Sequence, residues 1–536
     1  MRAVMATLST AVICVLTVCC IHTGMVIGFS SVDETRSLLE QYNAHEGSHS
    51  SFPKIKGPKS KHDKIAIIGA GPAGIHMAYK LKAAGYTNVT IFEMKSFIGG
   101  KSVTRYHRRV PHEMGTVYAQ PDYTEIYRLV KEFDAGRILP MPSPTVWINK
   151  EHPTPLSNLQ SNLQILASLR PDITNVTVAA VYIQQAIGKY VGLHSQMFGS
   201  YEGELMPRPS SVVLSQLNMT FLEFLKFHDI EVLKGLIVSA MTAQGYGHID
   251  EISALYGMMW VTPRFLTAVA TPPSPEVKSV VKILSKGFQF LWSEIARQFN
   301  LNVKLSSPVR QVMRLKHSDG FYVKYWKCGR LHGAMFDFII TSPTMKFMSN
   351  VINFDPKAQE LFSRTFNYYY TTTLADTDYG ANRGLSPQDY FTFNINSKEE
   401  SSVWVHRDSY SSLKYITDAN YTSGMYPDGP DGLYTQSSVY YQFSKERPSR
   451  QTLTRKLKDH ILNVEKATNL KIKDRMIWNY FPRYSVSDMA MGILWDIFDI
   501  QGEHGIWYIG SSVSFESVKS VVDYNNLLLR QFVCNN

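Results

Sequence analysis

A glycine-rich turn near the start of the chain constrains the fold more than any other feature of the sequence. The apolar run Ile65–Ile68 predicts a buried strand, and the letters GAGPAG that follow it have the spacing GxGxxG. Next come a run of helix formers from Ile75 to Ala84 and the segment Val89–Glu93, which predicts a second strand ending in an acid. Strand, tight turn, helix and strand form a βαβ unit, which predicts an α/β fold with a parallel sheet.

Each part of this unit has a task in holding a dinucleotide. Gly69 permits the turn, Gly71 lets the backbone approach a pyrophosphate, and Gly74 brings the helix close to the sheet, so that the helix N-terminus meets the phosphate charge. Glu93 is placed to accept hydrogen bonds from a ribose 2′-OH, which favours FAD or NAD over NADP. Such turns also join strands to helices for packing alone, but here all parts of the pattern agree. The predicted cofactor contacts of this unit are Gly69, Gly71, Pro72, Ala73, Gly74 and Glu93.

A second glycine pair distinguishes FAD from NAD. Gly99 and Gly100 come a few residues after the second strand. This extension resembles that of flavoproteins of the amine-oxidase type, in which the chain passes along the diphosphate and ribityl of FAD. The family generally has Arg on the flanks of this pair, whereas Ile98 and Lys101 stand there in this chain. The resemblance implies FAD as the cofactor, with Gly99, Gly100 and Lys101 among its contacts.

A segment in the middle of the chain resembles the family's first return to the nucleotide domain. Residues 299–327 alternate apolar and polar side chains with a turn at Ser318-Asp319-Gly320, and residues 335–344 predict one further buried strand. In the family, the residue that matches Val309 holds the adenine by its backbone. The resemblance therefore adds Val309 to the predicted cofactor contacts.

The C-terminal segment resembles the family's second return. A strand at Ile506–Ile509 leads into Gly510 and then into an amphipathic helix from about Glu516. In the family this strand, glycine and helix lie over the flavin ring and the ribityl chain. Ser511 stands where relatives usually carry Asp or Glu, and its hydroxyl can still bond the ribityl.

The resemblance also implies a domain organisation. Segments rich in Tyr, Phe, Met and Trp lie between the returns and would build a substrate domain. We therefore expect an amine-oxidase-like two-domain architecture, with a Rossmann-like FAD-binding domain interleaved with an α+β substrate domain. The predicted order is signal peptide 1–28, linker 29–62, FAD-binding domain 63–139, substrate domain 140–286, FAD-binding domain 287–345, substrate domain 346–479 and FAD-binding domain 480–536.

The N-terminus predicts export. One early Arg is followed by an almost uncharged apolar stretch, which is typical of a secretory signal peptide cleaved between Cys20 and Ser30. An uncleaved membrane anchor is the alternative, because the stretch approaches spanning length. We expect a secreted protein or one in the lumen of the secretory pathway, with no stable transmembrane span after cleavage. The sequons at Asn175, Asn218 and Asn420 can then carry glycans, whereas Asn88 starts a buried strand and is expected to stay unmodified.

Cysteine content and charge exclude several classes of function. Three of the five cysteines lie in the predicted signal, which leaves Cys328 and Cys534 for at most one disulfide and no metal site. Much of the net charge of +10 lies in the linker segment Lys54–Lys64, so the charge does not predict nucleic-acid binding. A homodimer is left open.

Beyond the superfamily, the sequence resembles the bacterial and red-algal flavoenzymes that isomerise the double bonds of polyunsaturated fatty acids. Matching pieces occur in the family's order over nearly the whole mature chain. They are IAIIGAGPAG, GGKS, HEMGTVYAQPDY, TAQGYGHIDEISALY, WNYFPRYSVSDM and WYIGSSVSF. The resemblance implies that flavin N5 abstracts a hydride from a bis-allylic carbon and returns it to another carbon of the same chain. Such a reaction needs a dry aromatic tunnel and no general base.

The resemblance assigns roles to individual residues. Glu113, Met114 and Gly115 match a loop beside the isoalloxazine. The predicted catalytic residues are Tyr118, Tyr246 and His248, of which the last two face the expected tunnel. The alternative is that HEMG and GYGHID are packing turns whose glycines permit close backbone approach.

The fatty-acid carboxylate needs a cationic or amide partner. Bacterial relatives use an Arg in a segment that matches Leu139–Lys150, which has none here. Arg264 is the replacement candidate, against the alternative that it faces solvent, and Tyr480 is the second predicted substrate residue. The partner expected from the resemblance is a polyunsaturated free fatty acid.

Two other functions stay open from the sequence. A secreted FAD-dependent amine or amino-acid oxidase would release hydrogen peroxide, and the fold alone does not exclude it. Such oxidases often place a Lys near flavin N5, and the sequence does not show whether Lys286 is so placed. A catalytically silent flavin-binding protein is the third reading.

Overall fold

The computed structural model describes most of the chain after the predicted signal peptide. All described residues belong to the compact unit His49–Asn536. The described ranges are 52–107, 110–140, 145–148, 156–199, 201, 203–270, 281–315, 319–378, 390–393, 398–408, 425–428 and 433–532. The predicted signal peptide, most of the predicted linker, Asn420 and Cys534 lie outside these ranges.

A five-stranded parallel sheet lies in the nucleotide-binding part of the molecule. Its strand order is β20-β13-β1-β2-β9, and every neighbouring pair is parallel. The central strand β1 is apolar throughout and at most 5% exposed, as expected for a strand covered on both faces. The strands are β1 (Ile65–Ile68), β2 (Val89–Phe92), β9 (Asn302–Lys304), β13 (Phe338–Thr341) and β20 (Ile506–Tyr508). The predicted α/β fold is confirmed.

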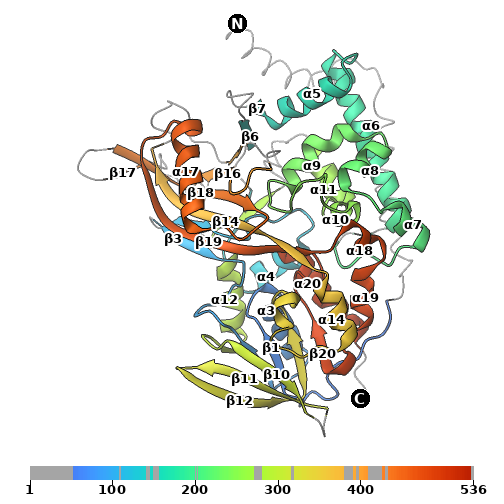
Figure 1. Ribbon diagram of the computed structural model, residues 1–536, viewed down its shortest axis with the longest axis vertical. Coiled ribbons are helices and arrows are strands. Elements are labelled where there is room, and N and C mark those ends of the chain that lie inside the picture. The colour runs from blue at the N-terminus through green and yellow to red at the C-terminus, as the bar shows by residue number, and fades with distance from the viewer. Residues whose placement is uncertain are drawn as a thin grey trace. The chain divides into compact units, whose positions relative to one another are not determined.

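Helices and a small antiparallel sheet cover this parallel sheet. The amide of Asn525 in the C-terminal helix donates to the carbonyl of Ala73, in the helix that follows β1, at 2.8 Å. The ring of Phe92 contacts Tyr325 and Phe336 of the antiparallel sheet β10-β11-β12, which lies close to β1 in Figure 1. These elements are α3 (Pro72–Ala83), α4 (Thr124–Glu132), α12 (Phe288–Gln298), α20 (Val518–Gln531), β10 (Val309–Arg314), β11 (Phe321–Lys327) and β12 (Arg330–Phe336).

A large, mainly antiparallel sheet forms the other layer. Its order is β19-β14-β18-β16-β15-β6-β7, and β17 pairs with β18 (Figure 1). Strand β14 is rich in Tyr and Thr, residue types that favour pleated, half-buried surfaces. The strands are β6 (Thr145–Ile148), β7 (Leu156–Ser157), β14 (Phe366–Thr377), β15 (Tyr390–Phe393), β16 (Val403–Asp408), β17 (Met425–Asp428), β18 (Leu433–Ser444) and β19 (Leu470–Arg483).

A group of helices lies beside this sheet, drawn mainly in green in Figure 1. They are α5 (Asn158–Leu169), α6 (Val176–Phe198), α7 (Ser211–Gln216), α8 (Phe221–Phe227), η1 (Glu231–Leu233), α9 (Lys234–Met241), α10 (Ala254–Trp260) and α11 (Pro263–Ala270). The remaining elements are β3 (Thr104–His107), β4 (Val110–Glu113), β5 (Ile138–Pro140), β8 (Lys282–Leu284), α13 (Met345–Met348), α14 (Pro356–Ser363), α17 (Arg450–His460), η2 (Ile461–Glu465), α18 (Val486–Ala490), α19 (Ile493–Asp499) and η3 (Glu503–Gly505). Within the described ranges, no helix combines the length and the apolar character that a bilayer span requires.

Three details differ from the sequence-based expectations. The single strand predicted over 335–344 is the end of β12 followed by β13, because Asp337 between them accepts a hydrogen bond from the backbone N–H of Lys64 at 2.8 Å. Glu113 lies in strand β4, which pairs with β3, so HEMG is not a loop throughout. The predicted domain boundary between 479 and 480 falls inside β19.

Candidate functional site

The turn between β1 and α3 has the geometry of a phosphate-binding site. Gly69 has φ +97°, and a Cβ on Gly74 would lie 2.0 Å from the Gly69 carbonyl oxygen, so both positions require glycine. Helix α3 begins after Gly71 with Pro72 at its first turn. Neither a capping side chain nor an acid occupies this helix end. The N–H groups of the first turn, which includes Ala73, are therefore directed at a space suited to an anion.

The second glycine pair closes this space from the other side. A Cβ on Gly100 would lie 2.8 Å from the Cα of Gly71, and the N–H of Gly99 donates to Ala70 at 3.0 Å. Two backbone segments far apart in the sequence thus meet without side chains between them. A side chain at either position would fill this cradle, and a pyrophosphate fits it because only backbone lines it.

The acid of the βαβ unit lies where the sequence places it. Glu93 directly follows β2, is 5% exposed, and accepts hydrogen bonds from the N–H groups of Ala70 and Lys95, each at 2.8 Å. These bonds fix the carboxylate beside the glycine turn, where its remaining lone pairs can accept from ribose hydroxyls. Val309, predicted to hold adenine, starts β10 at a register shift and is half-buried.

The C-terminal return also approaches the turn. Gly510 has φ +85°, and a Cβ there would lie 2.6 Å from the carbonyl oxygen of Ser342. The side chain of Ser342 lies 2.4 Å from the place of a Cβ on Gly69, so Gly69 and Gly510 flank the same serine. Ser511 is half-buried next to this glycine. The three predicted nucleotide segments therefore converge, and their residues fit FAD.

The HEMG segment links this cradle to the large sheet. A Cβ on Gly115 would lie 1.7 Å from the carbonyl oxygen of Lys101, so only glycine permits the approach. The carbonyl of Met114 accepts from the hydroxyl of Thr372 at 2.7 Å and from the indole of Trp478 at 2.8 Å. Met114 and Gly115 are thus held between the second glycine pair and strands β14 and β19.

Glu113 lies in a buried network of hydrogen bonds. Its carboxyl accepts hydrogen bonds from the hydroxyl of Thr104 at 2.8 Å and from the N–H of Phe288 at 2.5 Å. Phe288 is the first residue of α12, so Glu113 satisfies a helix N-terminus. Burial raises the pKa of Glu113 to about 7, although these bonds and Arg407 lower it. Its visible role is to fix β4 to α12.

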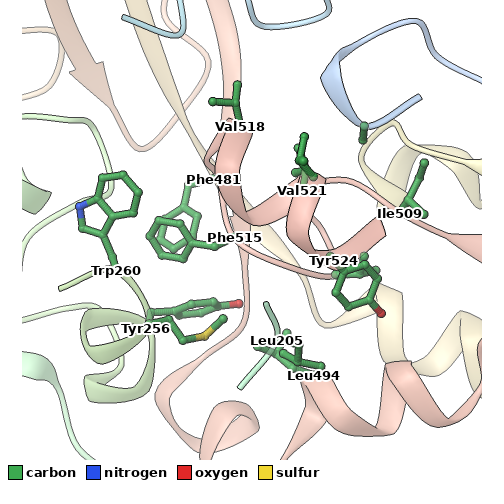
Figure 2. Packing of buried hydrophobic residues seen from close by; sticks show 14 of the residues in the cluster. Leu205, Tyr256, Trp260, Phe481, Leu494, Ile509, Phe515, Val518, Val521 and Tyr524 are labelled. Atoms are coloured by element: carbon green, nitrogen blue, oxygen red, sulfur yellow. The ribbon is translucent and has the colours of Figure 1, made fainter. Parts of the chain in front are cut away.

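An aromatic cluster lies next to Lys101. The rings of Tyr246 and Tyr480 stack at 5.9 Å, and those of Trp260 and Phe515 stack at 5.4 Å. Phe481 contacts Tyr246 at 5.5 Å and Phe515 at 4.8 Å, and Figure 2 shows Phe481 and Phe515 together with Trp260 beside them. We call the five residues Tyr246, Trp260, Tyr480, Phe481 and Phe515 the aromatic cluster.

Lys101 and Glu516 connect the aromatic cluster to the nucleotide site. The ammonium of Lys101 lies 2.5 Å from the carboxylate of Glu516 and 5.6 Å from the ring centroid of Tyr480. Glu516 also accepts from the N–H of Phe481 at 2.9 Å, and its carbonyl accepts from the hydroxyl of Tyr246 at 3.1 Å. The predicted cofactor residue Lys101, the predicted substrate residue Tyr480 and the predicted catalytic residue Tyr246 therefore lie together.

His248 and Arg264 lie outside the aromatic cluster. The ring of His248 packs against Trp404 at 5.0 Å and Phe443 at 6.2 Å, and burial lowers its pKa. Arg264 lies on α11 and is exposed, as expected if it faces solvent and not a substrate carboxylate. Lys286 places its ammonium over the ring of Phe290 at 4.7 Å.

Two buried arginines escaped the sequence-based predictions. Arg483, 2% exposed, donates to the carbonyl of Tyr246 at 2.5 Å and covers the ring of Tyr368 at 3.8 Å. Arg407, 6% exposed, lies in β16 near Tyr118. In the sequence, Arg407 stands in the polar half of strand VWVHRD, which gives no sign that it is buried.

The glycine cradle and the three converging segments define a dinucleotide-binding flavoprotein, and comparison with known proteins gives its family. The sequence pattern of the flavin-containing amine oxidoreductases matches residues 72–376, more than half of the chain. The chain belongs to this family, and its cofactor is FAD.

Among individual proteins, the chain is similar to two fatty acid isomerases. It is 24% identical over 499 residues to the polyenoic fatty acid isomerase of Ptilota filicina, covering 88% of this chain and 95% of that protein. The crystal structure of the CLA-producing fatty acid isomerase from P. acnes matches with a TM-score of 0.68 at 19% identity, covering 88% of this chain and 100% of that one. Putrescine oxidase bound to putrescine matches with a TM-score of 0.58 at 14% identity, covering 88% of this chain and 98% of that one. At these identities the structural matches establish the shared fold.

Proposed function

We propose that this protein is an FAD-dependent isomerase that moves the double bonds of polyunsaturated fatty acids to give conjugated products. The observation that carries the proposal is the aromatic cluster, which joins the FAD-binding segments through Lys101 and Glu516. The cluster consists of rings packed against one another, and the charges of Lys101 and Glu516 beside it neutralise each other. The similarity to the isomerase of Ptilota filicina over nearly the whole of both chains supports the same reading.

The chemistry of hydride removal and return belongs to the flavin. The residues of this chain have to bind the lipid, hold it in one orientation and exclude water, because water would trap a carbocation of the pentadiene. Rings such as Tyr246 and Tyr480 supply flat apolar contacts to a polyene. Burial holds the pKa values of both phenols well above the ordinary value of tyrosine, so both stay protonated and uncharged.

The test is an anaerobic reaction of the purified holoenzyme with arachidonate. An isomerase produces ultraviolet absorbance of conjugated double bonds without oxygen. Deuterium placed on a carbon between two alkenes reappears elsewhere in the same product chain. Deuterium lost to solvent, or no conjugated product in the presence of tightly bound FAD, would contradict the proposal.

The oxidase alternative is a second outcome of the same experiment. An amine or amino-acid oxidase would bleach the flavin with its substrate in the absence of oxygen and release hydrogen peroxide once oxygen is admitted. Arachidonate would then give no conjugated product. The oxidase alternative is tested because the chain shares its fold with putrescine oxidase.

We also propose that the protein acts in the secretory pathway or outside the cell, on the strength of the N-terminal apolar stretch. Asn175 and Asn218 are exposed, as a glycan requires. The expectation that burial protects Asn88 is wrong, because this residue is exposed where its amide donates to the carbonyl of His62 at 2.7 Å. Mass spectrometry of the secreted protein, before and after glycosidase treatment, tests both the cleavage and the glycans.

A further inference from the structure

Arg407 is a buried cation in an unusual setting. It lies in β16 and is 6% exposed, within a strand whose neighbours Val405 and Trp404 are fully buried. Burying a guanidinium is costly unless an anion or a full set of hydrogen bonds compensates it. The partners of Arg407 therefore decide what this residue is for.

The partners found are neutral. Nε of Arg407 donates to the hydroxyl of Tyr441 at 3.1 Å, and Nη2 donates to the backbone carbonyl of Glu113 at 2.7 Å. Among the residues that the structure describes, no carboxylate forms an ion pair with Arg407. The carboxyl of Glu113 is directed at Thr104 and Phe288 instead. Two hydrogen bonds use part of a guanidinium that carries five N–H donors, and the carboxyl of Glu113 interacts with its charge without forming an ion pair.

Arg407 also lines a cavity. This cavity has a volume of about 20 Å³ and is lined by Pro111, Glu113, Val117, Ile283, Leu284, Gly287 and Arg407. A space of this size holds about one water molecule, so only the carboxylate oxygens of a fatty acid would enter it and the hydrocarbon chain would lie outside. Apart from Arg407 and Glu113, its walls are apolar side chains and one glycine. A single cation in an apolar cavity matches the end of a molecule that is a carboxylate joined to a hydrocarbon.

The segment Glu113–Gly115 connects the cavity to the FAD-binding segments. Glu113, whose carbonyl holds Arg407, precedes the Met114-Gly115 segment that touches Lys101. Tyr118, one of the three predicted catalytic residues, is close enough to Arg407 to affect its ionisation. Arg407 is therefore held at the same side of the large sheet as the segment that reaches the cofactor site.

The titratable groups around Arg407 leave it as the dominant charge. Although burial lowers it, the pKa of Arg407 is raised overall by Tyr441 and Tyr118, so the guanidinium stays charged. Burial first and Arg407 second lower the pKa of His112 to about 3, so His112 is neutral. Burial raises the pKa of Glu113 to about 7, so much of it is protonated at neutral pH. An arriving anion therefore meets the full cation of Arg407 beside the partly protonated carboxyl of Glu113.

We propose that Arg407 binds the carboxylate of the substrate and thereby fixes how far the hydrocarbon chain extends toward the flavin. This inference rests on the proposed function for the identity of the substrate, and it replaces Arg264 as the anchor. Arg483 is the other buried candidate, but its guanidinium covers the ring of Tyr368 and does not line the cavity.

The experiment measures binding separately from turnover. Oleate has no carbon between two alkenes, so the proposed reaction cannot consume it. Its dissociation constant is measured by titration calorimetry with the holoenzyme, together with that of methyl oleate, which has the same chain without the charge. We expect the wild type to bind oleate at least about tenfold more tightly than the ester.

Arg407→Gln is expected to weaken oleate binding at least about tenfold and to leave the ester unchanged. Arg330→Gln, at an exposed position of β12, is the matched control and should bind oleate as the wild type does. Equal binding of oleate and its ester by the wild type would overturn the proposal even if the Arg407 variant did not fold. Unchanged oleate binding by a folded, FAD-loaded Arg407→Gln variant would overturn it as well, as would loss of oleate binding in Arg264→Gln alone.

The two proposals fail in different ways. Absence of conjugated products from arachidonate counts against the isomerase and leaves these dissociation constants measurable. Loss of oleate binding in the Arg407 variant then still identifies a carboxylate site.

Discussion

Replacing Glu113 by glutamine is expected to stabilise the protein in mildly alkaline solution and to change its stability in acid very little. Burial raises the pKa of this carboxyl from 4.5 to about 7 in the folded protein. Between these two values the folded state holds a proton that the unfolded state has released. The stability that the protonated carboxyl contributes is complete below about pH 4.5 and is lost as the pH rises through about 7. Glutamine does not ionise and escapes this loss.

The size of the effect follows from the shift. A difference of 2.5 pKa units corresponds to about 3 kcal/mol, most of it lost between about pH 5 and pH 8. For a chain of this length the entropy of unfolding is on the order of 1 kcal/mol/K, so the melting temperature changes by roughly 2–3 °C. Glutamine also preserves the local hydrogen bonds. Its amide oxygen accepts from Phe288, and the hydroxyl of Thr104 can rotate to accept from its amide N–H.

The assay is thermal unfolding of both proteins, followed by flavin fluorescence, at about pH 5 and about pH 8.5. The melting temperature of the variant minus that of the wild type should be roughly 2–3 °C more positive at the higher pH. Glu446→Gln, at an exposed position, controls for the general effect of removing a negative charge. A difference that is the same at both pH values, or that becomes more negative at the higher one, would refute the reasoning.

Three further perturbations test other parts of the structure. Gly71→Val should abolish FAD retention, because a Cβ at this position would already lie 3.4 Å from the facing Gly100 and the rest of the side chain would fill the cradle. The ratio of flavin to protein absorbance of the purified protein measures this. The control is Gly188→Val, where a Cβ has nothing within 4 Å, and this variant should retain FAD. Trp478→Phe removes an indole N–H that donates to the carbonyl of Met114 at 2.8 Å. Because this carbonyl keeps the hydrogen bond from Thr372, the loss should cost about 0.5–1.5 kcal/mol, seen as a lower melting temperature with an unchanged flavin spectrum. Although burial raises it, the pKa of Glu465 is held at about 2, chiefly by His406, so the wild type should lose stability as the pH falls from about 4.5 toward 2. In the same melting assay, the melting temperature of Glu465→Gln should fall less over this pH range. An equally large fall in the variant would contradict the interaction between Glu465 and His406.

The nucleotide site was accessible from the sequence because its requirements are local. A Cβ added at position 74 would lie 2.0 Å from the carbonyl oxygen of Gly69, so this turn forms only with glycine there. The spacing of the glycines in the sequence therefore predicts the geometry of the turn. The same holds for Gly115, which must pass Lys101. Backbone approaches of this kind leave a pattern that a single sequence displays.

The surroundings of the individual side chains were not accessible in this way. Arg407 meets the carbonyl of Glu113 across 294 positions of sequence, and Tyr246 meets the carbonyl of Glu516 across 270. Which residues face each other over such separations depends on how elements far apart in the sequence pack together, which no local pattern determines. The motif GYGHID illustrates the limit, because Tyr246 joins the aromatic cluster while His248, two residues later, packs against Trp404.

The charge at Arg407 bears on which substrates a fold of this family can accept. An amine substrate is a cation, and two like charges about 4 Å apart repel by roughly 4 kcal/mol at the effective dielectric of a protein surface, and by more where water is excluded. A carboxylate at the same distance is attracted by a similar amount. The resulting difference between the two substrate classes exceeds what one or two apolar contacts provide, since burying a methylene contributes about 0.8 kcal/mol. The parallel sheet and the glycine cradle are needed whichever substrate the flavin oxidises or isomerises. On the proposal that Arg407 binds the substrate, the sign of this one buried side chain separates carboxylate from amine substrates more strongly than the fold does.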